Sequence, residues 1–456
     1  MTGCGRADSD AVVVNVGYQS KTINTVNAGT LMRDRGELEK ALEQASRTTG
    51  KHYRVVWQDF ASGAPLTAQM IASHVDIGSM GDYPLLTNGS KTSAIADAKT
   101  ELVAVTGYNL RGSLNQVVVP PDSPAATLAD LRGKKVSTSL GSAADGMLTV
   151  GLQKTGMSAE DLGVVNQDPS IGAAALQGKQ VDAFAQFVPW PQLAIFRKEG
   201  RLLYDGGDNG IPTFHGVVVR TRFADANPDV MSAFMDAMAA TTKFIQTKPL
   251  EAAQRVSAVT GIEPEVIYLY NGPNGLVTFD MSIKDQLIAA LEKNKPFLVQ
   301  HGAVAENFSV KDFVNNKYVQ TEFGDMYPGQ RAQTTNPATL AGNDDVCGIP
   351  VNDPTKASET WFEGESSTKV SATPSCLLRA LAGSPAHPRA AYVPDAATGT
   401  RIFADHATWL TDAAVDSTDR FKPFATTAGA DAYRAQHPEA QPISYEAALQ
   451  QSRTAT

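Results

Sequence analysis

Three stretches of the chain place glycine and small polar residues where an apolar strand runs into a helix. The stretch Asp76–Gly89 (DIGSMGDYPLLTNG) joins two glycines to a proline in the expected first helical turn, and Ser62-Gly63 and Gly141-Ser142 occupy similar junctions. Such a junction leaves backbone N–H groups without an intrahelical partner, so it can bind an anion. A single junction of this kind is most often structural. Three of them around one site predict recognition of a small anion.

The elements that must position these junctions alternate between strand and helix, which predicts an α/β protein with mostly parallel sheets. No fixed-period repeat is visible. Because open α/β sheets bind ligands at the carboxyl ends of their strands, Gln19 at the end of the first strand is a candidate contact. Strands are expected at 11–17, 53–57, 102–107, 116–119, 134–138, 181–186 and 216–220, and helices at 34–46, 66–74, 145–155, 172–178 and 228–247.

Length and charge limit the classes of function. The 456 residues are enough for two or three domains, and the composition is that of a globular protein. A net charge of -9 with scattered lysines and arginines argues against nucleic acid as a partner. No apolar run reaches the roughly 18 residues of a membrane span.

The first residues, Met1-Thr-Gly-Cys4-Gly, resemble the end of a bacterial lipoprotein signal, in which the cysteine receives lipid. We therefore expect residues 1–10 to be a leader and tether, with Cys4 as the lipidation site and the membrane reached only through this anchor. The charged and apolar regions of a signal peptide are absent from this sequence. The alternative is an incidental cysteine in a leader.

The order of several motifs resembles the solute-binding proteins of ABC transporters for aliphatic sulfonates, taurine and nitrate. The resemblance implies a two-lobe periplasmic-binding-protein fold of type II, with a hinge and a central cleft. It places lobe I at 11–110 and 216–325 and lobe II at 111–215. The motifs that carry it are Gly17-Tyr-Gln, Arg35-Gly-Glu-Leu, Trp57-Gln-Asp-Phe-Ala-Ser-Gly-Ala-Pro65, Asp76-Ile-Gly-Ser-Met-Gly-Asp82, Leu131-Arg-Gly-Lys-Lys-Val136, Gly141-Ser142, Gly178-Lys-Gln-Val-Asp-Ala183 and Pro189-Trp-Pro191.

The same resemblance implies where the ligand is bound. An apolar group of the ligand would lie against Tyr83, Phe187 and Trp190, although Trp190 alone could equally be a core residue. Asp82 is unfavourable beside an anion, so we expect it to cap its own helix. The complete expected site is Gln19, Ser62, Gly63, Met80, Gly81, Asp82, Tyr83, Ser142, Phe187, Trp190 and Phe214.

The expected ligand is an alkyl or aryl sulfonate or sulfinate. Related sulfonate binders often carry an acidic residue where this chain has Val188, so a ligand with an amine is disfavoured. Helix N-termini and hydroxyl groups can bind a sulfonate without a cationic side chain. Nitrate and pyrimidine-type solutes remain alternatives. The implied protein is an extracytoplasmic monomer without a cofactor, whose partner is an ABC permease.

The last third of the chain differs in composition. A linker is expected at 326–342, and residues 343–456 resemble a NosL-like α+β domain, a copper-binding accessory module. Where that family commonly has Cys-Gly-Met, this chain has Cys347-Gly-Ile349, which removes a soft copper ligand. We expect Cys347 and Cys376 to form a disulfide, with copper binding or trafficking as the alternative.

An enzyme on the same fold is the competing class of function, as in pyrimidine synthases related to the family. Such enzymes need cysteine- and histidine-rich sites, whereas Cys4 is the only cysteine before residue 340. His74, His215 and His301 lack metal-ligand spacing and are interpreted as structural or surface residues, although His215 could face the cleft. The sequence therefore favours a binding protein over an enzyme.

Overall fold

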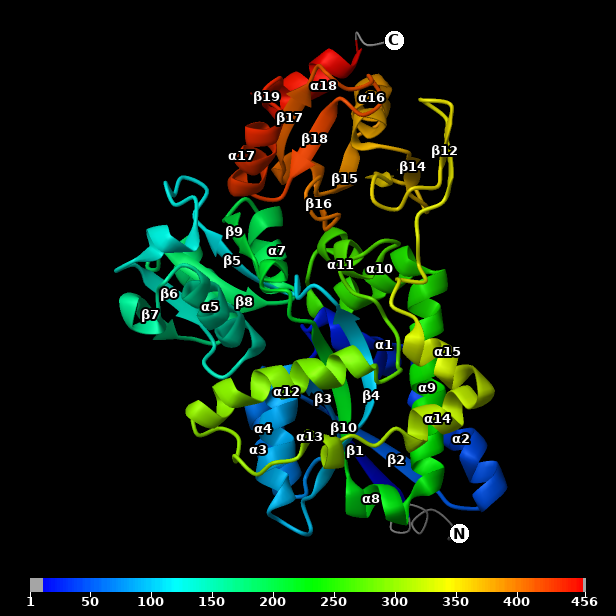
Figure 1. The fold of residues 1–456 in the computed structure, drawn as a ribbon. Helices are drawn as coiled ribbons and strands as arrows, with labels where there is room; N and C mark the ends of the chain where they lie inside the picture. The colour runs from blue at the N-terminus through cyan, green and yellow to red at the C-terminus, as the bar shows by residue number, and fades with distance from the viewer. Residues whose placement is uncertain (1–10, 454–456) are drawn as a thin grey trace.

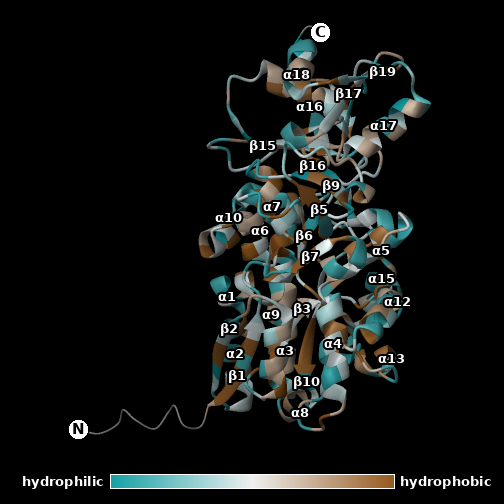
Figure 2. Cartoon of the chain, turned by 90° about the vertical axis from the view of Figure 1, so that its left-hand side faces the viewer, coloured by the Kyte–Doolittle hydropathy of each residue, from teal (hydrophilic) through white to brown (hydrophobic). Residues whose placement is uncertain are grey.

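The computed structural model describes residues 11–453, which form two α/β lobes and a smaller C-terminal domain (Figure 1). Figure 2 shows the lobes and the C-terminal domain stacked along one long axis. The expected α/β fold with two lobes is confirmed, but the sheets are not mostly parallel as expected, because two of the four strand pairings in each lobe sheet are antiparallel. Cys4 and its tether lie outside the described residues. Within the described range, no helix has the length and apolar character needed to cross a membrane.

Lobe I is built on a five-stranded sheet in the order β2-β1-β3-β10-β4. β1 runs parallel to β2 and β3, whereas β10 is antiparallel to both β3 and β4. Its central strands are rich in valine and isoleucine, which pack well when both faces of a sheet are buried. The strands are β1 (Val12–Tyr18), β2 (Tyr53–Asp59), β3 (Ile77–Gly81), β4 (Thr100–Asn109) and β10 (Thr213–Arg220).

Helices cover both faces of this sheet (Figure 1), and each helical layer buries its own apolar cluster. One layer contains η1 (Ile23–Ala28), α1 (Thr30–Arg35), α2 (Glu37–Thr49), α8 (Thr221–Ala226), α9 (Pro228–Thr247), α14 (Lys317–Phe323) and α15 (Tyr327–Ala332). The other contains α3 (Gly63–Ile71), α4 (Asp82–Ser93), α12 (Asp285–Gln300) and α13 (Val310–Phe313).

Lobe II has a second five-stranded sheet, in the order β7-β6-β8-β5-β9. β6 is parallel to β7 and β8, and β5 is antiparallel to β8 and β9. Its strands are β5 (Asn115–Val119), β6 (Lys135–Thr138), β7 (Gly163–Asn166), β8 (Ala183–Phe187) and β9 (Arg201–Asp205). Its helices are α5 (Ala143–Lys154), α6 (Pro169–Gln177) and α7 (Trp190–Phe196), with short η2 (Leu128–Leu131), η3 (Ala159–Asp161) and η4 (Gly206–Asn209).

The chain passes between the lobes twice, from β4 to β5 and from β9 to β10. The expected lobe boundary between residues 215 and 216 falls inside β10, which already begins at Thr213. The apolar pattern starts only at Gly216, because polar Thr213 and His215 also belong to this buried strand. Helices α10 (Pro249–Thr260) and α11 (Pro264–Asn271) share an apolar cluster with lobe II residues and the C-terminal domain.

The expected linker at 326–342 is partly folded, because η5 (Gly324–Met326) and α15 occupy its beginning and Tyr327 is buried in the core of lobe I. The C-terminal domain then starts with the hairpin β11 (Gly342–Asp344) and β12 (Ile349–Val351). Its other strands are β13 (Ser358–Phe362), β14 (Lys369–Ser371), β15 (Pro388–Pro394), β16 (Arg401–Phe403), β17 (Thr408–Asp412), β18 (Phe421–Phe424) and β19 (Ala440–Ile443). Its helices are α16 (Pro374–Gly383), η6 (Ala404–His406), α17 (Thr427–Gln436) and α18 (Tyr445–Arg453).

The C-terminal domain contains two halves with the same topology. Two strands, a helix and a third strand follow one another in both, and the strand orders β14-β13-β15 and β18-β17-β19 correspond. The helix N-caps, Thr373 and Thr426, both accept a backbone hydrogen bond, and both first strands carry a buried tryptophan. The distances along the chain between matching residues vary, so the sequence shows no fixed period.

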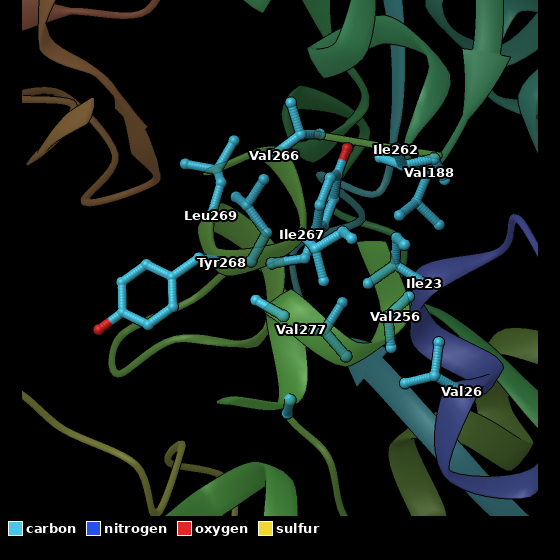
Figure 3. Packing of buried hydrophobic residues seen from close by; sticks show 14 of the residues in the cluster. Ile23, Val26, Val188, Val256, Ile262, Val266, Ile267, Tyr268, Leu269 and Val277 are labelled. Carbon is cyan, nitrogen blue, oxygen red and sulfur yellow. The ribbon is translucent and has the colours of Figure 1, made fainter. Parts of the chain in front are cut away.

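The C-terminal domain is anchored on α11 beside both lobes. Figure 3 shows part of the shared cluster, where Val266 and Ile267 of α11 lie near Ile23 of η1 and Val188 of lobe II. The same cluster contains Trp361, Tyr392 and Phe403 of the C-terminal domain. Close by, Arg401 and Glu359 form a buried ion pair. The Tyr268 hydroxyl donates a hydrogen bond to Glu359 at 2.9 Å.

Candidate ligand-binding site

A cavity of about 240 Å³ lies between the lobes, where three helices begin. The starts of α3 and α4 form its lobe I wall, and the start of α5 forms part of its lobe II wall. The ends of β1 and β8 complete it. The lining residues are Gln19, Ser62, Gly63, Ala64, Gly81, Pro84, Ser139, Leu140, Gly141, Ser142, Ala143, Asn166, Asp168, Phe187 and His215.

The cavity wall offers uncharged hydrogen-bond donors. Ser62 is the N-cap of α3, and its hydroxyl makes no capping bond. Ser142 caps α5 by accepting a hydrogen bond from the Asp145 N–H at 3.3 Å, which leaves its own hydroxyl hydrogen to donate. No lysine or arginine is among the lining residues that the structure describes. Backbone N–H groups and helix dipoles at the three helix starts therefore supply the attraction for an anion.

Two glycines allow the lobe I wall to form. A Cβ on Gly63 would lie 2.4 Å from Cβ of Pro84, so only glycine lets the starts of α3 and α4 come this close. A Cβ on Gly81 would lie 3.2 Å from Nε2 of His215. Both glycines thus bring helix starts to the cavity through close packing of the backbone.

A second cavity of about 250 Å³ adjoins the first and shares Gln19 and Asp168 with it. Trp190, at the start of α7, lines this cavity together with Phe60 and Pro169. Lys21 Nζ lies 5.9 Å from the centroid of the Trp190 ring. The adjoining space therefore combines an aromatic face with charged groups at its mouth.

His215, which the sequence left as a possible cleft residue and outside the expected site, lines the cavity. The Asn24 amide nitrogen contacts its Nδ1; with this nitrogen as the donor, the neutral ring carries its proton on Nε2, the atom nearest Gly81. Burial lowers the pKa of His215 to about 3, so the ring is uncharged at neutral pH. His215 thus offers one more neutral donor at the cavity wall.

The structure separates the expected site residues into two groups. Gln19, Ser62, Gly63, Gly81, Ser142 and Phe187 line the first cavity, and Trp190 lines the adjoining one. Met80 and Phe214 do not line either cavity, because their side chains are fully buried in the lobe I core. Tyr83 is also buried, and it packs against Gly146 of lobe II, where a Cβ would lie 2.1 Å from the tyrosine oxygen.

Two buried carboxylates, Asp82 and Asp145, lie in the first turns of α4 and α5. The Asp82 carboxylate accepts a hydrogen bond at 2.9 Å from the Tyr83 N–H of its own helix, which matches its expected capping role, although Gly81 occupies the N-cap position. Burial raises the pKa of Asp82 to about 6. Burial also raises the pKa of Asp145, whose carboxylate accepts a hydrogen bond from the Gly141 N–H at 2.9 Å. Asp82 and Asp145 therefore serve the helix starts and do not line the cavity.

The two C-terminal cysteines form the expected disulfide, Cys347–Cys376. Asp344 lies beside them and could complete a metal-binding group. Its carboxylate, however, accepts backbone hydrogen bonds from Val346, Cys347 and Ala372. In this state the sulfur atoms are bonded to each other, so the group offers no thiolate to copper.

Comparison with known proteins places part of the chain near one family. Residues 85–252, which run from α4 in lobe I through lobe II to α10, match the family described as NMT1/THI5 like. A protein of Bacillus subtilis (strain 168) named as an aliphatic sulfonates-binding protein is 23% identical over 290 residues, 64% of this chain and 83% of that protein. The taurine-binding periplasmic protein of Escherichia coli (strain K12) is 24% identical over 68% of this chain and 97% of its own length.

A solved structure shares the fold of the two lobes. The alkanesulfonate-binding protein of Xanthomonas axonopodis pv. citri bound to MOPS superimposes with a TM-score of 0.55 at 23% identity. The match covers 68% of this chain and 99% of that protein. The two lobes therefore have the periplasmic-binding-protein fold, and the C-terminal domain is an addition to it.

Proposed function

We propose that this protein is an extracytoplasmic solute-binding receptor that holds a small organic anion, an alkyl or aryl sulfonate or sulfinate, between its lobes. The observation that carries the proposal is the meeting of three helix N-termini, from both lobes, around one cavity without a lysine or arginine in its lining. The relatives that bind sulfonates and taurine support the same class of solute.

The chemistry of a sulfonate suits this wall. Its three oxygens are permanent acceptors, and hydrogen bonds from neutral donors to a charged acceptor contribute roughly 1.5–3 kcal/mol each. The Ser62 and Ser142 hydroxyls and the His215 Nε2–H group are placed to donate along with the backbone. Since His215 stays neutral, the protein holds the same donors over the physiological pH range.

The rest of the ligand would extend from the anion site into the adjoining cavity. Phe187 lies in the first cavity and Trp190 in the second, and Gln19 lies in both. The second cavity also contains Asp59, Asp168 and Lys21 at its mouth. This path suits an apolar chain or ring of moderate size.

The receptor would act as a monomer that delivers its solute to an ABC permease. Attachment to the membrane would occur through lipid on Cys4. Both parts of this proposal follow from the resemblance of the chain to solute-binding lipoproteins.

A thermal-shift screen of the purified chain tests the proposal. The panel contains alkane- and arylsulfonates, sulfinates, nitrate, pyrimidines and Cu(I). A ligand at 100 times its dissociation constant adds about 2.7 kcal/mol to the free energy of unfolding, which gives a clear shift. We expect sulfonates or sulfinates to stabilise the protein and to be recovered chemically unchanged. Stabilisation by pyrimidines, nitrate or Cu(I) alone, or conversion of the ligand, would refute the proposal.

A further inference from the structure

The C-terminal domain contains a larger cavity of its own, of about 590 Å³. It lies between strands β13 and β14, the second half of α16 and the β11–β12 hairpin, and it shares no residue with the inter-lobe cavities. Its volume is within the range of roughly 300–1,000 Å³ that is typical of small-molecule sites. The lining residues are Asn343, Asp344, Asp345, Val346, Thr360, Phe362, Thr368, Lys369, Val370, Ser371, Arg379, Ala380, Gly383 and Ser384.

A buried hydroxyl without a partner lies in the wall of this cavity. Thr360 is 2% exposed, and its Oγ1 has no hydrogen-bond partner among the described residues. Trp361, the next residue of β13, packs toward α11, so Thr360 is on the opposite face, where α16 lies. Leaving a buried hydroxyl unpaired destabilises a fold. A bound molecule that forms a hydrogen bond with Thr360 would offset that cost.

Two cationic side chains, Lys369 and Arg379, lie at the same wall and make no ion pair within the described range, although the charge of Arg379 acts on nearby Asp416. Lys369 is opposite Thr360 in the β13–β14 ladder and makes no ion pair within the described range; its Nζ lies 5.3 Å from the centroid of the Phe362 ring. Arg379 donates to the Ser417 carbonyl at 2.9 Å and contacts Cys347 Sγ at 3.6 Å. Its guanidinium retains further N–H donors.

The acids of the lining do not neutralise these cations directly. Asp344 is buried and its carboxylate accepts three backbone hydrogen bonds, so it is committed to the hairpin. Asp345 is exposed at the outer wall. The groups left to meet a ligand are therefore the Lys369 and Arg379 cations, the Thr360 hydroxyl and the apolar side chains.

The disulfide fixes one wall of this cavity. Cys347 lies in the loop of the β11–β12 hairpin and Cys376 in the first turn of α16, so the bond ties the hairpin to the helix. Asn343–Val346 are held over the space beside Arg379 as a result. The cavity wall thus does not depend on the contacts of a short hairpin alone.

We propose that this cavity is a second ligand site, which binds a small organic anion with an apolar part independently of the inter-lobe site. Lys369 and Arg379 attract the anionic group, and Thr360 hydrogen-bonds to it. The apolar part packs against Phe362, which is buried. This inference does not depend on the function proposed for the lobes.

The experiment counts binding sites by calorimetry with 8-anilinonaphthalene-1-sulfonate, an aromatic sulfonate, on the full oxidised chain. We expect one site in the C-terminal domain and, where the function proposed for the lobes holds, a second one between the lobes. Lys369→Ala should weaken one of them roughly tenfold, the effect of losing one charge-assisted hydrogen bond. Lys311→Ala, which removes an exposed lysine from lobe I, is the matched control and should change neither site. A variant of the inter-lobe site, Ser142→Ala/Trp190→Ala, should weaken the other site only.

A second variant separates a ligand contact from a structural role. Thr360→Val keeps the shape of the side chain and removes the unpaired hydroxyl, so it should raise the melting temperature while weakening the C-terminal site severalfold. A lower melting temperature with unchanged binding would show that the hydroxyl is structural. The proposal is overturned if Lys369→Ala and Thr360→Val bind the probe as the wild type does, or if the inter-lobe variant abolishes all binding.

Discussion

Replacing Trp190 by alanine tests whether the second inter-lobe cavity takes the apolar part of the ligand. Trp190 begins α7 and is half-buried, so its ring remains available to a bound molecule. A ligand that covers about 60–80 Å² of the ring would gain roughly 1.5–2 kcal/mol at 25 cal/mol per Å². The dissociation constant should therefore rise roughly 10- to 30-fold in Trp190→Ala.

The measurement is a calorimetric titration with the sulfonate that gives the largest thermal shift. Trp190→Phe serves as the control, because it keeps an aromatic face and should bind within about threefold of the wild type. Trp190 also packs against two apolar clusters, so a loss of about 1 kcal/mol in stability is expected and must be measured separately. An unchanged dissociation constant in Trp190→Ala would remove this residue from the site and confine the ligand to the first cavity.

Three further changes test the site and the fold. Ser142→Ala should weaken sulfonate binding about 10- to 100-fold by calorimetry, because a hydroxyl donor to the anion is lost; equal affinity would place the anion elsewhere. Asp82→Asn should stabilise the protein by about 2 kcal/mol more at pH 8 than at pH 4 in denaturant titrations, because the carboxyl pKa is raised by burial to about 6 and its ionised form is disfavoured in the fold. A pH-independent difference would contradict this. Glu359→Ala should cost about 3–5 kcal/mol in denaturant unfolding, because Arg401 is left buried without its partner. A Glu359→Gln variant as stable as the wild type would show that the charge is unimportant.

The local fold could be predicted where periodicity and terminal residues agree. Helix α9 was expected at 228–247 and has those bounds, because Pro228 suits a first helical position and its buried side chains recur with helical spacing. The helices after the Ser62 and Ser142 junctions were also expected, at 66–74 and 145–155, but they begin earlier, at Gly63 and Ala143. These signals involve residues that are close together in the chain, so a single sequence is enough to recognise them.

Strand geometry explains why Met80 and Phe214, both expected in the site, do not line the inter-lobe cavities. Successive side chains in a strand point to opposite faces, so a residue next to a lining residue points into the core. Gly81 and His215 line the cavity, and Met80 and Phe214 are their neighbours in β3 and β10. The sequence shows the strands but does not show which face of each meets the other lobe. A buried polar residue in an apolar strand, as His215 is, was the available signal.

In the C-terminal domain, too, some features could be predicted from the sequence, whereas contacts between distant segments could not. The disulfide could be expected because Cys347 and Cys376 are the only cysteines beyond the leader. The contact of Glu359 and Arg401 with Tyr268 could not, because these residues meet only after the domain docks on α11. Variable spacing between the two halves of the domain also concealed their common topology.

The inter-lobe cavity needs no cationic side chain for the proposed anion, because fixed backbone dipoles attract it at a lower desolvation cost than a lysine. A lysine enclosed between two lobes would lose its hydration, and the ion pair formed with the ligand would repay that loss only with ideal geometry. Backbone dipoles at the starts of α3, α4 and α5 are fixed by the fold and lose much less on enclosure. His215 follows the same rule, because burial keeps it neutral while it still donates a hydrogen bond. The three glycine-containing junctions and His215, which the sequence left as a possible cleft residue, are therefore parts of one arrangement, whose neutral donors suit the proposed anion.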